Sequence, residues 1–243
     1  MLHPFEEKWR LRFERFAAKP TDAGIAGWSE RGLDARVAFF QRTIKLEGKG
    51  RWGDIGCGAG TYTRLLKQQG QDVVGVDYSW PSLVKAKGQA LLPWVGGNAY
   101  HLPFLSSAFD GILCFGVLQV LSQEGEVIKE LNRVLKTKGE LWIDGLNIFC
   151  PWHFTDILRR YFQKRPLHLR YVNPYAIKAS LKTYGFTDLK LYWMPILPKY
   201  LTRLQWVFLL SGVQKIMNGL PWVSMWFSHA FYLHARKRNN EMV

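Results

Sequence analysis

The chain has 243 residues, of which 48% are hydrophobic and 15% aromatic, so it can bury a packed core and is not expected to be globally disordered. This length suits one open α/β domain with modest extensions, and it would crowd two independent domains. The formal net charge of +14 predicts an anionic partner, such as a phosphate-bearing substrate, a membrane surface or nucleic acid. Three cysteines without CxxC spacing predict neither a disulfide framework nor a zinc site, and we expect no bound metal.

Residues 1–47 are predicted to form a helical cap. Aromatic side chains recur there at helical spacing, which predicts a helix whose aromatic stripe packs on the core, at Phe5, Trp9, Phe13 and Phe16. A second helix is predicted from about Leu33 to Leu46. The N-terminal stretch is charged throughout, unlike a signal peptide, so we expect a cytoplasmic protein.

From residue 48 to residue 146 the chain alternates between strand-like and helix-like segments. Short apolar runs predict strands at Arg51–Ile55, Asp72–Val76, Trp94–Val95, Gly111–Phe115 and Glu140–Ile143. Helices are predicted between most of them, at Tyr62–Gln69, Pro81–Ala90 and Glu124–Leu135. This alternation predicts βαβ units and a parallel sheet, which binds ligands at the carboxyl ends of its strands.

After Leu146 the pattern changes. A basic and aromatic stretch comes first, followed by a helix at Pro174–Tyr184 and strands at Thr187–Trp193 and Ser228–Ala235. Between these strands we expect a basic, amphipathic insertion at about 195–227 that is helical and rich in aromatic residues. Residues 151–243 hold fourteen Lys or Arg and three Asp or Glu, so the positive charge is concentrated in this half. We expect residues 1–243 to form a single domain, with 48–146 as its ligand-binding core and 147–243 as its substrate side.

A Gly-rich turn, DIGCGAG at Asp54–Gly60, lies between a predicted strand and a predicted helix. Its glycines would let a ligand approach the backbone, and the helix that follows offers free N–H groups to a carboxylate or phosphate. The next strand ends at Asp77, whose carboxylate can accept hydrogen bonds from both hydroxyls of a ribose. The GxGxG spacing differs from the GxGxxG of dinucleotide sites, although an NAD-dependent oxidoreductase stays an alternative for this turn.

Five segments in this order resemble the successive motifs of the class I S-adenosylmethionine-dependent methyltransferases: DIGCGAG, VGVDYS, GNAYHLPF, FDGILCFGVLQVL and LNRVLKTKGELWI. The resemblance covers about residues 48–146, and weakly 173–193 and 228–237. It implies a Rossmann-like, doubly wound, seven-stranded, mostly parallel sheet, here with a helical N-terminal extension and an insertion before the last strand. It also implies S-adenosylmethionine as cofactor and S-adenosylhomocysteine as product.

The resemblance implies a role for each matched residue. Asp77 would hold the ribose, Tyr78 would lie against the adenine, and Asn98 would stand where the family usually has an Asp. The residues expected to contact the cofactor are Asp54, Gly56, Cys57, Gly58, Gly60, Asp77, Tyr78, Asn98, Ala99 and Phe115.

Methyl transfer needs a general base only when the acceptor must lose a proton. His153 is our first candidate because it follows the fifth predicted strand and lies between aromatic residues. Gln119 and His101 are further candidates, although Gln119 stands where many relatives have His or Glu. For each of these residues alone, a structural role is the competing interpretation.

The segments 151–171 and 200–227 occupy the places where this class inserts its substrate-binding cover. Aromatic and Arg side chains there predict an acceptor with an apolar part and an anionic part, bound by Trp152, Arg159, Arg160, Arg165, Trp206 and Trp222. We therefore expect a methyltransferase of a small lipophilic or lipid-linked acceptor, with peripheral contact at an anionic membrane surface. A methyltransferase of RNA or another polyanion is the first alternative, and an inactive cofactor-binding partner subunit is the second.

Overall fold

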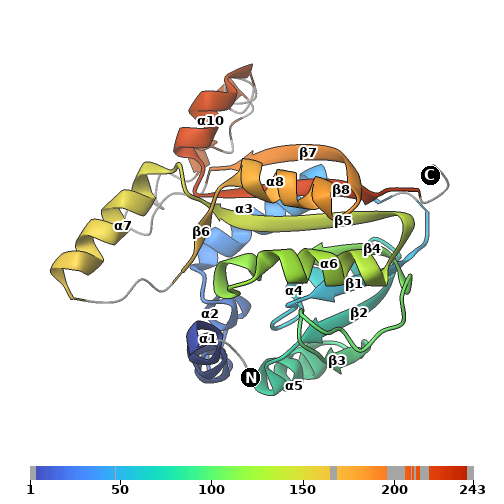
Figure 1. Cartoon of the computed structure of the whole chain (residues 1–243). Coiled ribbons are helices and arrows are strands. Elements are labelled where there is room, and N and C mark those ends of the chain that lie inside the picture. The colour runs from blue at the N-terminus through green and yellow to red at the C-terminus, as the bar shows by residue number, and fades with distance from the viewer. Residues whose placement is uncertain are drawn as a thin grey trace.

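The computed structural model describes residues 4–46, 48–164, 169–195, 206–208, 210, 212–213 and 219–239, and within them a twisted sheet has helices on both faces (Figure 1). The main strands are β1 (Arg51–Ile55), β2 (Asp72–Asp77), β3 (Trp94–Gly96), β4 (Phe109–Cys114), β5 (Leu135–Asn147), β7 (Phe186–Met194) and β8 (Ala230–Lys237). They run in the order β3-β2-β1-β4-β5-β8-β7, and β8 is antiparallel to both of its neighbours. This arrangement confirms the predicted seven-stranded, mostly parallel sheet.

One short strand was not predicted. β6 (Tyr171–Val172) pairs in parallel with the end of β5, at Leu146 and Asn147. The strand predicted at Glu140–Ile143 is also longer than expected, because β8 pairs with β5 from Glu140 as far as Leu146.

The helices are α1 (Pro4–Phe16), α2 (Asp22–Ala26), α3 (Glu30–Thr43), α4 (Thr61–Gln68), α5 (Trp80–Gln89), the 3-10 turn η1 (Leu118–Val120), α6 (Glu124–Val134), α7 (Pro151–Phe162), α8 (Pro174–Thr183) and α10 (Pro221–Phe227). The predicted helices lie close to their expected positions, whereas α2, η1 and α7 were not predicted. The helix predicted from Leu33 begins earlier, at Glu30, because the Ser29 hydroxyl accepts the N–H of Gly32 as a cap. Much of the amphipathic insertion predicted at about 195–227 lies outside the described residues.

Both faces of the sheet are buried, as βαβ units require. Successive residues of β4 point to opposite faces, so Ile112 and Leu113 belong to different hydrophobic clusters. On one face Leu131 of α6 and Leu181 of α8 are fully buried with Ile112. On the other, Phe40 of α3 packs with Leu113.

A buried ion pair joins α3 to the middle of the sheet. Arg36 Nη1 lies 2.8 Å from Asp144 Oδ2, and it also donates to the Tyr232 hydroxyl at 3.0 Å. The other carboxylate oxygen of Asp144 accepts the N–H of Gly116 at 2.6 Å. The Arg36 guanidinium lies 4.4 Å from the centre of the Trp28 ring. Both carboxylate oxygens of Asp144 accept a hydrogen bond, and Arg36 Nη1 donates to two acceptors, so the two charges are tolerated inside the protein.

A second buried carboxyl group connects β1 to α4. Asp54 is 2% exposed, and its Oδ2 accepts a hydrogen bond from the Thr63 hydroxyl at 2.6 Å. Removal from water raises the pKa of Asp54 to about 7, although the bond from Thr63 opposes this rise.

We predict that Arg36→Met lowers the free energy of unfolding by about 3–5 kcal/mol, because it leaves the Asp144 carboxylate buried without its cation. Burial already raises the pKa of Asp144 and Arg36 counters that rise, so the variant raises this pKa further. The loss of stability should therefore be smaller at low pH and grow as the pH rises through that pKa. Urea denaturation checks this, with Arg51→Met as control because the Arg51–Asp72 pair is exposed. Equal losses in the two variants would contradict the role given to Arg36.

We predict that Asp54→Asn removes a pH dependence of stability. Burial raises the pKa of the Asp54 carboxyl to about 7 in the folded protein, against an ordinary value of 3.8. Between these values the folded chain binds more protons than the unfolded chain, so rising pH lowers the wild-type free energy of unfolding by up to roughly 4 kcal/mol. Denaturation midpoints across this range should fall more steeply in the wild type and in Asp72→Asn, an exposed control, than in Asp54→Asn, where the raised pKa values of Asp77 and Asp144 remain. If the midpoints of all three proteins changed with pH in parallel, the role given to Asp54 would be refuted.

Candidate functional site

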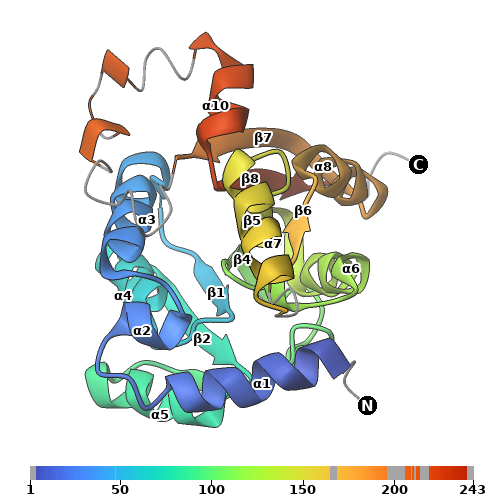
Figure 2. The ribbon, with the colours of Figure 1, turned by 90° about the vertical axis from the view of Figure 1, so that its left-hand side faces the viewer.

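A cavity lies at the carboxyl ends of β1, β2 and β4, and it contains about 930 Å³ of non-atom space counted to its open mouth. The helices α1 and α2 lie along the same side of the molecule as these strand ends (Figure 2). Parallel strands deliver their last residues to one edge, so three segments far apart in the chain meet here. The walls are mostly apolar and the cavity is open at its mouth, as is typical of a small-molecule site.

The Gly-rich turn forms the floor of this cavity. Its backbone is anchored where the N–H of Gly56 donates to the carbonyl of Val76 at 2.7 Å. Gly56 and Gly58 have φ angles of 78° and 53°, in the left-handed region that favours glycine. A Cβ on Gly56 would lie 2.3 Å from Val117, whereas a Cβ on Gly58 would meet no heavy atom within 4 Å. The turn is therefore packed at Gly56 and open at Gly58.

Asp77 at the end of β2 lines the cavity and also holds the turn in place. Its two carboxylate oxygens accept the N–H groups of Gly58 and Ser79, each at 2.8 Å. Burial raises the pKa of Asp77 even though these backbone donors oppose the rise. Each oxygen keeps a further acceptor position for a ligand.

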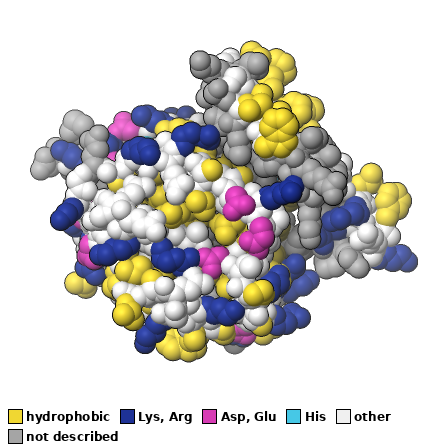
Figure 3. All heavy atoms as spheres, turned by 180° about the vertical axis from the view of Figure 1, so that it is seen from behind, with side chains coloured by type: hydrophobic (Ala, Val, Ile, Leu, Met, Phe, Trp, Pro, Cys, Tyr) yellow, Lys and Arg dark blue, Asp and Glu magenta, His cyan; other side chains and the backbone are white. Residues whose placement is uncertain are grey.

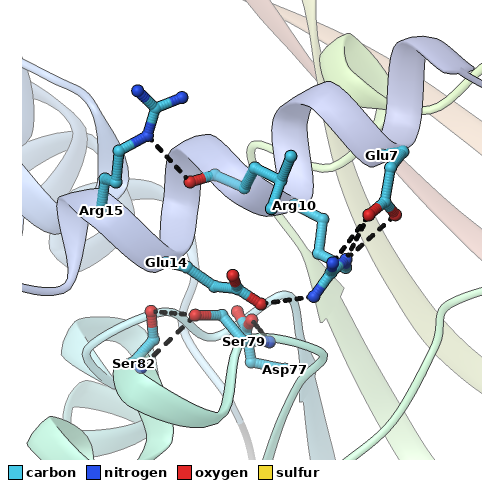
Figure 4. Close-up of polar contacts among 8 residues, drawn as sticks. Glu7, Arg10, Glu14, Arg15, Asp77, Ser79 and Ser82 are labelled. Carbon is cyan, nitrogen blue, oxygen red and sulfur yellow. Dashed lines mark hydrogen bonds and ion pairs between the residues drawn. The ribbon is translucent and has the colours of Figure 1, made fainter.

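Helix α1 crosses over this strand end. In Figure 4, Glu14 of α1 lies above Asp77 and Ser79, and Arg10 bridges Glu14 and Glu7 along the helix. The site therefore lies between the sheet edge and the N-terminal helices.

The N-terminal helices supply cavity residues that the sequence analysis missed. The aromatic stripe of α1 packs on the core as predicted, through Trp9, Phe5 and Phe13, but Phe13 also lines the cavity, with its ring centroid 6.3 Å from that of Tyr78. The loop and helices that follow add further lining residues: Asp22, Ile25, Ala26, Trp28 and Leu33. No motif marks these residues, because it is their docking across the sheet edge that brings them to the cavity.

Most of the residues expected to contact a cofactor come together here. The cavity is lined by Gly56, Cys57, Gly58, Asp77, Tyr78, Asn98, Ala99 and Phe115. Asp54 and Gly60 are not among the lining residues. Asp54 is turned towards Thr63 beneath the turn, and Gly60 is the N-cap of α4.

The cavity has an acidic character. Asp22 and Asp77 are the two carboxylates on its walls, and no Lys or Arg is found among the described residues that line it. Asp22 is tied down by Arg64 of α4 in an ion pair. An uncharged or partly cationic ligand fits such walls better than one carrying several phosphates.

The three candidate catalytic residues lie in different places. Gln119 in η1 is 6% exposed, next to the lining residues Val117 and Val120, and none of the described residues donates a hydrogen bond to its Oε1. His101 is exposed in the loop after β3, outside the cavity. His153 in α7 also lies outside the lining, with its ring centroid 3.9 Å from that of Tyr171.

The expected substrate-side residues lie on the outer segments. Trp206 and Trp222 are 60% and 64% exposed, Arg159 is exposed, and Arg160 is half-buried. None of these four lines the cavity. Arg165 and the side chain of Trp152 lie outside the described residues.

Comparison with known proteins places the chain among methyltransferases. The family model of a methyltransferase domain matches residues 53–143. A bifunctional biotin biosynthesis protein of Cellvibrio japonicus is 36% identical over 152 residues, which are 62% of this chain and 28% of that protein. The malonyl-[acyl-carrier protein] O-methyltransferase of Legionella pneumophila is 33% identical over 100 residues, or 38% of this chain and 35% of that one. The chain thus spans only about a third of the length of these curated relatives.

A solved structure extends the similarity to nearly the whole fold. Phosphoethanolamine N-methyltransferase 2 of Haemonchus contortus superposes with a TM-score of 0.66 at 21% identity, over 94% of this chain and 61% of that one. An identity this low shows a shared fold only. The fold, the five ordered motifs and the family match agree that residues 53–143 of this chain form a class I S-adenosylmethionine-dependent methyltransferase domain.

Proposed function

We propose that this protein transfers a methyl group from S-adenosylmethionine to a small acceptor that has an apolar part and an anionic part. The observation that carries the proposal is the cavity in which Asp77 and the open backbone at Gly58 meet, at the carboxyl edge of the sheet.

The cavity fits the cofactor of the family. Asp77 would accept hydrogen bonds from the ribose hydroxyls, and the backbone near Gly56 and Gly58 would border the methionine part. Tyr78 and Asn98 would lie at the adenine. The side-chain oxygen of Asn98, Oδ1, already accepts the N–H of Tyr100 at 3.0 Å, so the second acceptor position of this oxygen would face the ligand. When bound, S-adenosylmethionine supplies a methyl group that its sulfonium has already activated.

The charge of the walls favours this cofactor over a dinucleotide. S-adenosylmethionine carries a sulfonium, an ammonium and one carboxylate, so it brings no phosphate to walls that hold Asp22 and Asp77. A dinucleotide would place two phosphates in a cavity with two carboxylates and no described base. The NAD-dependent alternative therefore loses support.

The acceptor would meet apolar walls first. Trp28, Leu33 and Phe115 line the cavity, so an acceptor group that enters is desolvated and aligned, which is the main contribution a methyltransferase makes. Arg159 and Arg160 lie outside the cavity on α7, where they would attract an anionic group that stays at the mouth. The named acceptors of the Legionella and Haemonchus proteins, malonyl-acyl carrier protein and phosphoethanolamine, both carry an anionic group.

Groups near the acceptor side could hold or take a proton. The amide of Gln119 can orient an acceptor but cannot remove its proton. His153 stacks on Tyr171, and the Tyr171 hydroxyl lies 2.9 Å from His229 Nε2, so three titratable rings meet beside the end of β5. We retain His153 as the candidate base on this side, with Gln119 as an orienting residue. His101 is the weakest candidate because it is exposed outside the cavity.

We predict that Gly58→Ala weakens binding of S-adenosylhomocysteine by at least about tenfold, because a methyl group fits the folded turn but occupies the space a ligand needs. Gly70→Ala is the matched control, since Gly70 also has a positive φ and its Cβ would meet nothing within 4 Å, but it lies away from the cavity. Both variants should lose roughly 1 kcal/mol of stability to backbone strain. Calorimetric titration and urea denaturation check both effects. Equal affinity in the two variants would contradict the site.

The acceptor class can be tested with a labelled methyl group. We expect the protein, incubated with methyl-labelled S-adenosylmethionine and separate fractions of lipid extract, RNA and water-soluble metabolites, to label a solvent-extractable amphiphile. Nuclease-sensitive label would instead support a methyltransferase of RNA. Cofactor binding without labelling in any fraction would support the inactive partner subunit.

We further propose that the protein meets its acceptor at a membrane surface while staying peripheral to it. Among the described residues, no helix is long and apolar enough to cross a membrane. Contact would then depend on surface helices and on the net positive charge of the chain.

A further inference from the structure

Helix α7 has its apolar side turned away from the protein. Phe154, Leu158, Tyr161 and Phe162 recur at helical spacing on one side of the helix, and each is between 57% and 76% exposed. The inner side carries His153, which packs on Tyr171. A surface helix of a globular protein normally turns its apolar side inward, so α7 has the opposite orientation.

Helix α10 has the same inverted arrangement. Trp222, Trp226 and Phe227 are 64%, 56% and 46% exposed, whereas the polar Ser224 is 2% exposed on the inner side. The neighbouring Leu220 is 40% exposed. Burying a serine while exposing two tryptophans loses apolar burial, so the folded chain alone does not explain this helix.

These exposed side chains are concentrated in the C-terminal half of the chain. Seventeen large hydrophobic residues are exposed in the described part of the chain, and ten of them lie within 154–162, 206–210 and 220–227. Figure 3 shows hydrophobic atoms gathered on two groups that extend beyond the body of the protein, with Lys and Arg side chains nearby. Exposed apolar groups this dense mark an interaction surface.

The charge around this surface indicates what covers it. Arg159, Arg160 and Lys164 lie in the last turn of α7 or just after it. Residues 151–243 hold fourteen basic and three acidic side chains. A second copy of this chain would bring like charges together, whereas an anionic lipid surface offers negative headgroups next to an apolar interior.

We propose that α7 and α10 form a docking face that lies in the interface of an anionic bilayer. The docking face consists of Phe154, Leu158, Tyr161, Phe162, Trp222, Trp226 and Phe227. Its aromatic and leucine side chains enter the headgroup boundary, while Arg159 and Lys164 contact lipid phosphates. Only the three residues 148–150 separate α7 from the end of β5, so docking holds the acceptor edge of the sheet at the membrane. This last consequence rests on the proposed function, whereas lipid binding itself does not.

Vesicle flotation with the full chain tests the docking face. We expect binding to vesicles of equal parts phosphatidylcholine and phosphatidylglycerol, weaker binding as salt is added, and little binding to phosphatidylcholine alone. The double variants Leu158→Ser with Phe162→Ser, and Trp222→Ser with Trp226→Ser, should each lower the partition coefficient by about tenfold or more. Because these side chains are exposed, the variants should keep the wild-type unfolding midpoint.

The controls separate docking from general hydrophobicity and from cofactor binding. Leu91→Ser with Leu105→Ser removes leucines that are 96% and 85% exposed away from α7 and α10, and it should bind vesicles as the wild type does. Docking-face variants should bind S-adenosylhomocysteine normally, and Gly58→Ala should still bind vesicles. Docking and the methyltransferase site can therefore fail independently.

Three results would overturn the proposal. The first is no binding to anionic vesicles. The second is an equal loss in the Leu91/Leu105 control. The third is a wild-type dimer that the docking-face variants convert to monomer without any vesicle binding, which would assign the same residues to self-association.

Discussion

The arrangement of this molecule depends on the buried pair of Arg36 and Asp144. Two charges removed from water are tolerated only when each finds partners, so α3 must dock where the arginine reaches both Asp144 and Tyr232. The same carboxylate accepts the N–H of Gly116, a residue of the cavity wall. One interaction thus sets the position of the N-terminal cap, the centre of the sheet and the acceptor side of the site.

The Gly-rich turn serves the fold and the ligand with the same atoms. Asp77 holds Gly58 and Ser79 in place and keeps acceptor positions on the cavity side. Asp54 supports the turn from below through its hydrogen bond with Thr63. This support requires a buried carboxyl group, and burial raises the pKa of that group. A turn prepared in this way needs little rearrangement when a ligand arrives, which favours affinity.

Charge divides the protein into two regions with different partners. The described cavity walls hold two carboxylates and no Lys or Arg, as suits a cationic cofactor. The C-terminal half is strongly basic and exposes aromatic side chains on α7 and α10. Opposite charges on the two surfaces would keep the cofactor in the cavity and direct anionic lipids to the outer helices.

Local pattern was sufficient for much of this. Most strands and helices of residues 51–146 follow from short-range periodicity. The Gly-rich turn and Asp77 were marked as the proposed cofactor site by their spacing and by the resemblance to the methyltransferase family. Tertiary structure decided the rest. Arg36 and Asp144 are 108 residues apart, and the sequence around each of them gives no sign that they form an ion pair. Phe13 belongs to an aromatic stripe whose spacing is compatible with packing on the core and with contact to a ligand. The apolar stripe of α7 is likewise compatible with packing on the core and with contact to a membrane. Periodicity tells which residues share a face, but only packing against the other elements determines what that face meets.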